Sequence, residues 1–363
     1  MSAHHHASLP IWTWAAPILA AGLLALKFAH VVPADATPVL VLAGVLLGAA
    51  VFAAVHHAEV LALKLGEPFG SILLAVAVTV IEVALVASIM LSGGEGSERV
   101  ARDTVFAAVI IVLNGVVGLC LVLGASRHFE QTFQLQGASS ALAVLGTLAV
   151  LALILPNFTL AVPGPSYSAL QIEVIGLMSL ALWGVFVFVQ TIKHRDYFLD
   201  GSDEAESAEV PGNLMALASL ALLILSLVCV VLLAKVLSYP LDAGIAAVGL
   251  PKAFVGVVIA MLVLLPEGLA AVKSAMQNRL QNSINLALGS AIASIGLTIP
   301  TVALVSVLLN RQIALGVSPT DMTLLALTLY ISALTLGTGR TSVLQGAVHL
   351  VIFAAFLLVS AVP

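Results

Sequence analysis

Long apolar runs separated by short polar segments make up most of this chain of 363 residues. About eleven of these runs come close to the 20 residues that a helix needs to cross the hydrocarbon core of a bilayer. Their approximate limits are 11–32, 38–63, 69–92, 101–124, 138–157, 168–191, 212–236, 248–275, 282–309, 321–338 and 342–362. The pattern predicts an all-α polytopic membrane protein with about eleven transmembrane helices.

One strongly polar stretch, LDGSDEAESAE (199–209), follows the sixth apolar run. With the first run set apart, this stretch separates five runs from five. An odd number of spans in each group gives the groups opposite orientations, which is the inverted-repeat plan of many secondary transporters. We therefore predict an N-terminal tail with a first helix (1–36), a five-helix repeat (37–198), an acidic cytoplasmic linker (199–211) and a second five-helix repeat (212–363).

The composition supports the membrane assignment and narrows the classes of function. The chain is 61% hydrophobic and 9% charged, with a mean hydropathy of +1.18, whereas soluble domains contain about 25% charged residues. A net charge of −5 without a basic patch argues against a nucleic-acid partner.

Cys120 and Cys229 lie in apolar runs and are predicted to be buried thiols. The run from Ile11 is too long for a signal-peptide core, so we predict a retained helix.

The distribution of Lys and Arg predicts a cytoplasmic N-terminus. In that orientation the inner loops hold seven cations against five on the outer side, a weak positive-inside bias. The inner residues are Lys64, Arg127, Lys193, Arg195, Lys273, Arg279 and Arg340. The outer residues are Arg99, Arg102, Lys235, Lys252 and Arg311.

Two glutamates lie deep inside apolar runs and carry the functional prediction. Glu82 is inside 70–91 and Glu267 is inside 256–272. A charge at the centre of a membrane helix costs about 2.5–3.5 kcal/mol on insertion scales. Each acid falls in the second span of its predicted repeat, 267 − 82 = 185 residues apart. We therefore predict that Glu82 and Glu267 bind a cation, as metal ligands, or the protons exchanged for it.

Neutral oxygens accompany both glutamates in the sequence. Thr79 precedes Glu82 by three residues, so the two share a helix face. Pro266 precedes Glu267 and has no N–H, which deprives the carbonyl of Leu262 of its helical donor. In a broken membrane helix such freed carbonyls line cavities, and they suit a hard cation. Thr79 and the Leu262 carbonyl are therefore candidate ligands.

Other polar residues of the spans are further candidates. Asn114 lies mid-membrane and needs a hydrogen-bond partner or an ion. Ser283, Ser290, Ser294 and Thr301 share one helix face. Ser290 and Ser294 are plausible oxygen ligands if that face meets Glu267, although small residues also serve close helix packing.

The remaining polar residues have competing interpretations. His57 and Glu59 could pass protons toward the site, or form an interfacial helix end. His349 is predicted to be a packed core histidine, and Asp103 suits a charge at a helix start. The acids of the linker are predicted to be a solvated connector, with a collector of cations as the alternative. No P-loop, HExxH, GxSxG or CxxC motif is present, which argues against an ATP-driven pump or an enzyme.

The chain resembles the calcium/proton antiporters of the cation/calcium exchanger superfamily, bacterial ChaA type. The resemblance covers nearly everything after the first span. It rests on segments 66–86, 114–137, 249–272, 283–300 and 339–358.

The resemblance implies eleven helices, two inverted five-helix repeats and an acidic cytoplasmic connector. It also implies one essential glutamate in each repeat, which falls on Glu82 and Glu267. Wider members of the superfamily carry an asparagine three residues before each glutamate. This chain has Thr79 and Leu264 there, so only the first position keeps an oxygen.

The sequence thus predicts a secondary antiporter that exports Ca²⁺ in exchange for protons by alternating access. The predicted partners are inorganic cations, protons and the bilayer, with no organic cofactor. An Na⁺(K⁺)/H⁺ antiporter at the same site is the alternative, and a cation channel is a less favoured one. The sequence sets neither the stoichiometry nor an oligomeric state.

Overall fold

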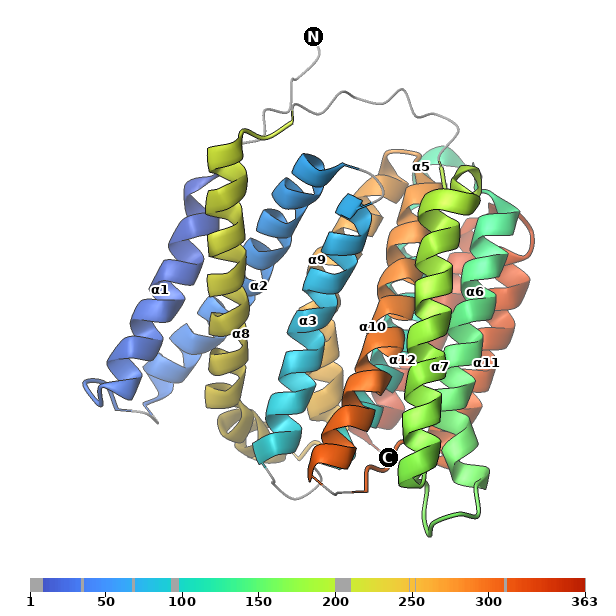
Figure 1. The fold of residues 1–363 in the computed structure, drawn as a ribbon. Helices are drawn as coiled ribbons and strands as arrows, with labels where there is room; N and C mark the ends of the chain where they lie inside the picture. The colour runs from blue at the N-terminus through green and yellow to red at the C-terminus, as the bar shows by residue number, and fades with distance from the viewer. Residues whose placement is uncertain are drawn as a thin grey trace. The chain divides into compact units, whose positions relative to one another are not determined.

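A computed structural model describes residues 9–33, 36–66, 69–92, 98–199, 210–247, 249–251, 253–309 and 312–362. In these ranges ten helices are long and apolar enough to cross a membrane. A further helix, α3 (Phe69–Ser92), occupies the third predicted span. The prediction of an all-α polytopic protein is confirmed (Figure 1). Nearly all of the predicted acidic linker lies outside the described residues.

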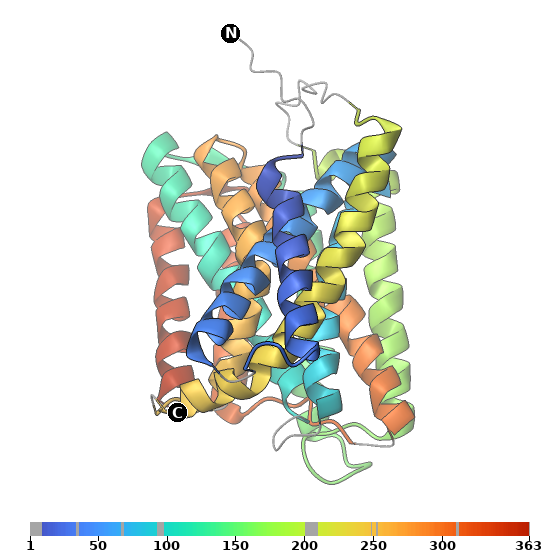
Figure 2. The same cartoon turned by 90° about the vertical axis from the view of Figure 1, so that its left-hand side faces the viewer.

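The chain divides into two compact units, of which the first comprises Met1–Ile89 and Ser202–Val248. Its helices are α1 (Ile11–Phe28), α2 (Thr37–Leu65), most of α3, and α8 (Asn213–Ala247). Helices α1, α2 and α8 pack side by side (Figure 2). Buried alanines such as Ala50 and Ala54 let the helices approach closely.

Helix α8 is longer than the sequence predicted. It continues through Pro240 to Ala247, 247 − 236 = 11 residues beyond the predicted end of the span. The apolar run ends before the helix does, because hydropathy reflects only which residues prefer lipid. The helix itself can continue for as long as its backbone hydrogen bonds are formed.

The second unit comprises Met90–Gly201 and Gly249–Pro363. Its first half contains α4 (Val100–Ile110), the π-helical turn η1 (Ile111–Val116), α5 (Val117–His128), β1 (Gln131–Thr132), α6 (Leu135–Ala149), η2 (Val150–Ile154), η3 (Leu155–Phe158), α7 (Ala169–Phe188), η4 (Val189–Lys193) and η5 (Arg195–Tyr197). Its second half contains α9 (Ala253–Met276), α10 (Leu280–Leu309), α11 (Pro319–Leu336), β2 (Arg340–Thr341) and α12 (Val343–Ala361).

The continuous rod α4–η1–α5 forms the core of the second unit. In its most apolar window 83% of the residues are buried, against 22% for α12. Glycines allow this central rod to be surrounded closely. A methyl group on Gly346 of α12 would lie 2.7 Å from the backbone nitrogen of Val122, and one on Gly118 would lie 3.1 Å from Cβ of His349. Helices α5 and α12 therefore pack almost backbone to backbone.

A two-residue strand pair ties the ends of helices in this unit. β1 and β2 are antiparallel, with Gln131 opposite Thr341. The Gln131 side chain also donates to the carbonyl oxygen of Ala275, at 2.9 Å, near the end of α9. Each compact unit takes helices from both predicted repeats, and the predicted four-part division of the chain stays a prediction.

Candidate cation site

Glu82 lies in the middle of α3, in the first unit, and only 4% of its surface is exposed. Thr79 is 3% exposed, one turn earlier on the same helix. Thr79 and Glu82 therefore share a face of α3, as predicted, and both side chains are buried. The other side chains of this helix that are described as buried are apolar, for example Ile81 and Val86.

Glu267 lies in α9, in the second unit, and is 8% exposed. The structure corrects one expectation here, because α9 is a single unbroken helix from Ala253 to Met276 with Pro266 in its interior. A proline removes one backbone hydrogen bond without ending a helix that its neighbours hold in place. The Leu262 carbonyl still lacks its i+4 donor, so it remains a candidate ligand within a continuous helix.

The turn of α9 that carries Glu267 packs against the π-helical turn that carries Asn114. A methyl group on Gly268 would lie 3.2 Å from Cγ2 of Val116. Asn114 is two residues earlier, in η1, and is fully buried. Insertions of π-helix into α-helices occur frequently at functional sites. Two of the predicted site residues of the second unit therefore lie on turns in direct contact.

Asn114 finds protein partners in a buried polar network. Its Nδ2 donates to Oγ1 of Thr328, at 2.8 Å, and its Oδ1 accepts from Nδ1 of His349, at 2.9 Å. Because Nδ1 carries the hydrogen, Nε2 of neutral His349 accepts from Oγ1 of Thr335, at 3.1 Å. His349 is buried in the core as predicted, and its ring belongs to this polar network. One lone pair on Asn114 Oδ1 remains for a further partner.

The hydroxyl face of α10 can be placed along α9 by one hydrogen bond. Ser283 Oγ donates to the carbonyl oxygen of Ala271, at 2.7 Å. The two helices are antiparallel, so four residues back from Ala271 in α9 correspond to four residues forward from Ser283 in α10. Glu267 is therefore level with residue 287 of α10. Ser290 is then about 4.5 Å away along the helix axis and Ser294 about 10 Å away, at 1.5 Å per residue.

Thr298 is a buried hydroxyl that the sequence analysis missed. It is fully buried, and its Oγ1 has no hydrogen-bond partner among the residues that the structure describes. It follows Ser294, which is 1% exposed, by four residues and therefore shares its face. A search for the i+4 step along the predicted serine face would have found it.

A cation bound at either glutamate would depend on neutral oxygens. Across the described ranges no three His, Cys, Asp or Glu side chains gather as a metal site. Ca²⁺ takes about six to eight oxygen ligands in proteins. The remaining ligands would have to come from neutral oxygens of the same unit, such as Thr79 for Glu82, and Asn114, Ser290 and the Leu262 carbonyl for Glu267.

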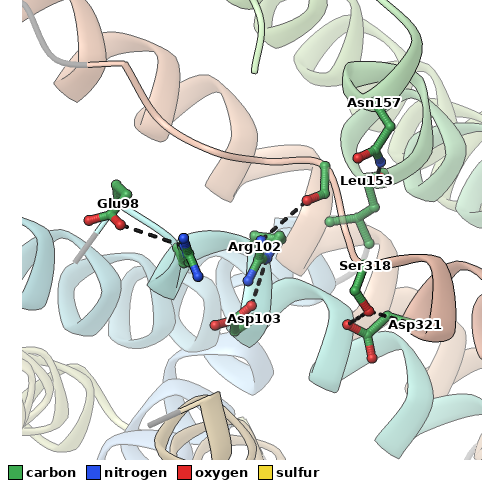
Figure 3. Close-up of polar contacts among 9 residues, drawn as sticks. Glu98, Arg102, Asp103, Leu153, Asn157, Ser318 and Asp321 are labelled. Atoms are coloured by element: carbon green, nitrogen blue, oxygen red, sulfur yellow. Dashed lines mark hydrogen bonds and ion pairs between the residues drawn. The ribbon is translucent and has the colours of Figure 1, made fainter. Parts of the chain in front are cut away.

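Charged residues at the start of α4 pair with one another. Arg102 Nε lies 2.7 Å from Oδ1 of Asp103, and Arg102 Nη1 donates to the carbonyl oxygen of Gly316, at 3.3 Å (Figure 3). Glu98 and Arg99 form a second pair, at 3.6 Å. Asp103 lies in the first turn of α4, where the helix dipole stabilises a negative charge.

The structure does not bring His57 and Glu59 together. His57 is fully buried, and its Nε2 donates to the carbonyl oxygen of Thr13 in α1, at 3.0 Å. Glu59 is exposed. Residues two apart on a helix do not face each other. His57 therefore fastens α1 to α2, and a proton path through both residues stays a prediction.

The sequence profile of the family described as sodium/calcium exchanger protein matches residues 36–192 and 218–362. The chain belongs to this family. The two matched segments cover all but the first of the predicted spans and leave out the acidic linker. Sodium/calcium exchangers are transporters, so the prediction that the chain is not an enzyme is confirmed.

Relatives and a solved structure match the chain along most of its length. It is 59% identical over 360 residues to the ionic transporter y4hA of Sinorhizobium fredii, covering 98% of each chain. It is 34% identical to the sodium-potassium/proton antiporter ChaA of Escherichia coli, covering 88% of this chain and 87% of ChaA. The crystal structure of the Ca²⁺/H⁺ antiporter protein YfkE matches with a TM-score of 0.72 at 14% identity, over 97% of this chain and 99% of YfkE.

The family assignment confirms the class of function predicted from the sequence, a secondary cation/proton antiporter in a multi-pass membrane protein. The likeness to YfkE shows the fold of this exchanger and nothing finer. The roles of the individual residues rest on the geometry above and remain predictions.

Proposed function

We propose that this exchanger exports Ca²⁺ from the cytoplasm in exchange for protons, using Glu82 and Glu267. The observation that carries the proposal is the burial of one carboxylate in the middle of α3 and one in the middle of α9. Burial of a charge is costly unless the charge is neutralised by a proton, a cation or a polar partner. Each of the two glutamates is therefore suited to bind a proton and a cation in turn.

The coupling follows from charge. With one proton on each glutamate, or with one divalent cation, the pair of carboxylates is neutral. Without either, it carries two negative charges in a medium of low dielectric, which raises the cost of any conformational change that moves them through the membrane. Exchange results if only the neutralised states pass between the inward-facing and outward-facing forms. No organic cofactor takes part.

The cargo is assigned on ligand chemistry. Carboxylates with hydroxyl, amide and carbonyl oxygens suit Ca²⁺, and YfkE is named as a Ca²⁺/H⁺ antiporter. An Na⁺(K⁺)/H⁺ antiporter is the second candidate, because ChaA is named as a sodium-potassium/proton antiporter and Leu264 brings no side-chain oxygen. We further propose a bacterial inner membrane with a cytoplasmic N-terminus.

Uptake into proteoliposomes under a fixed proton gradient tests the function and the cargo. We expect slow, saturable Ca²⁺ uptake that stops when the gradient is collapsed. Uptake of Na⁺ or K⁺ without Ca²⁺ uptake would favour the second candidate. Fast cation flux that does not saturate would contradict a carrier and indicate a channel.

Competition between protons and Ca²⁺ for the same carboxylates predicts a pH dependence. As the pH falls, a larger fraction of the glutamates is protonated, so the apparent affinity for Ca²⁺ is expected to weaken. If two protons leave for each Ca²⁺, the apparent dissociation constant changes by up to about 100-fold for each pH unit in the range where both groups titrate. The measurement is initial uptake against Ca²⁺ concentration from about pH 6 to pH 9. An affinity that stays constant over this range would place the protons elsewhere.

A further inference from the structure

A basic pocket lies where α5 and α9 end, within the second unit. Its volume is about 680 Å³. Arg127 and His128 line it from the last turn of α5, and Leu269, Val272, Lys273 and Met276 line it from the last turns of α9. No acidic side chain lines the pocket among the described residues.

The two cations of this pocket, Arg127 and Lys273, have no acidic partner among the described residues. Arg127 and Lys273 form no ion pair or side-chain hydrogen bond within the part of the chain that the structure describes. Glu130, which follows shortly after α5, pairs with Arg340 on β2, at 3.9 Å. The positive charge of the pocket is therefore available to a ligand.

The end of α9 does not need these cations either. A helix C-terminus exposes carbonyl oxygens that attract cations and repel anions. Here the carbonyl of Ala275 accepts from Nε2 of Gln131, and that of Met276 accepts from Nε2 of His128, each at 2.9 Å. The last carbonyls of α9 are thus already bonded, which lowers their repulsion of an anion at the pocket.

Apolar side chains in and beside the pocket are exposed. The side chains of Leu269 and Met276 are 55% and 38% exposed, and Phe129, directly after α5, is 92% exposed. Exposed apolar side chains on membrane-length helices meet lipid, and the ends of such helices lie at the depth of the lipid headgroups. Positive charge at headgroup depth is therefore combined with apolar surface on the side of the acyl chains.

We propose that this pocket binds the phosphate of an anionic phospholipid. Arg127 and Lys273 neutralise the phosphate, and the exposed apolar side chains pack against the upper part of the acyl chains. Basic pockets at the ends of membrane helices are suited to such headgroups. A soluble phosphate shares the charge but gains nothing from the apolar side chains. The lining of this pocket includes none of the predicted cation ligands, and the proposal does not depend on the cargo.

The test is a titration of the purified full-length protein with short-chain phosphatidylglycerol, followed by thermal unfolding and by fluorescence binding. An Arg127→Gln/Lys273→Gln variant is expected to bind the lipid roughly 30-fold more weakly, since each surface cation contributes on the order of 1 kcal/mol and 1.4 kcal/mol is a factor of ten. Lys193→Gln/Arg195→Gln removes the same charge at another helix end and should bind like the wild type. Lys273→Arg keeps the charge and should do the same.

Three results would overturn the proposal. The first is equal affinity of the double variant and the wild type for phosphatidylglycerol. The second is stabilisation by inorganic phosphate or glycerol phosphate as strong as that by the lipid, which would assign the pocket to a soluble phosphate. The third is a loss of thermal stability of the double variant in neutral phosphatidylcholine alone, which would show that acidic groups of the chain itself already occupy the pocket. Binding of phosphatidylglycerol but not phosphatidylcholine by the wild type, lost in the double variant, supports it.

Discussion

Glu82→Gln and Glu267→Gln are each expected to reduce proton-driven cation uptake to the level of protein-free vesicles. Glutamine keeps the size of the side chain and one ligating oxygen, but it neither carries the negative charge nor releases a proton. Both glutamates are buried in the middle of membrane-length helices, where no solvent can replace the missing charge. The measurement is initial uptake by reconstituted protein under a fixed proton gradient.

Glu173→Gln provides the matched control, because Glu173 is an exposed glutamate on the membrane-length helix α7. This variant should transport like the wild type. All three variants should elute as folded protein with similar thermal stability, since glutamine keeps the size of glutamate and one of its hydrogen-bond acceptor oxygens. Near-normal transport by Glu82→Gln or Glu267→Gln would exclude that residue from the proposed exchange.

Gly346→Ala is expected to destabilise the protein by about 3 kcal/mol, the upper end of the usual cost of overpacking. The added methyl group would lie 2.7 Å from the backbone nitrogen of Val122 and 2.8 Å from the carbonyl oxygen of Gly118. Neither backbone atom can turn aside, so α12 would have to move away from α5. Thermal unfolding of the purified protein in detergent measures the effect.

Gly184→Ala is the control for this substitution. Gly184 lies inside α7 with no atom within 4 Å of the added methyl group, so the change should be neutral or stabilise the helix by up to about 1 kcal/mol. Equal stability of the Gly346→Ala and Gly184→Ala variants would contradict the close packing of α5 and α12. The pair separates a packing effect from the general preference of helices for alanine.

Hydropathy along the sequence was sufficient to locate the membrane helices. The predicted run 101–124 corresponds to the rod from Val100 to His128, and the run 342–362 to α12. The two central glutamates also stood out, because an acid in an apolar run is conspicuous whatever surrounds it. The sequence did not reveal that α9 continues through Pro266, because a proline shows which donor is missing but not whether neighbours hold the helix together.

The partners of polar side chains were set by the tertiary structure alone. Asn114 bonds to residues 214 and 235 positions away, Thr328 and His349, and no local pattern links them. No local pattern predicts that α8 belongs to one compact unit with the first helices of the chain. Nor does one predict the contact between Gly268 and Val116.

The sequence by itself thus determined the class of this protein, the position of its helices along the chain and the two acids inside them. These features depend on the solvent that each segment of about 20 residues meets, and that preference is a local property of composition. Which faces of the helices meet, and at what depth their hydroxyls, amides and glycines lie opposite one another, was decided only by the tertiary structure. Those contacts depend on the rotation and axial shift of each helix against its neighbours, which close packing of many side chains fixes together.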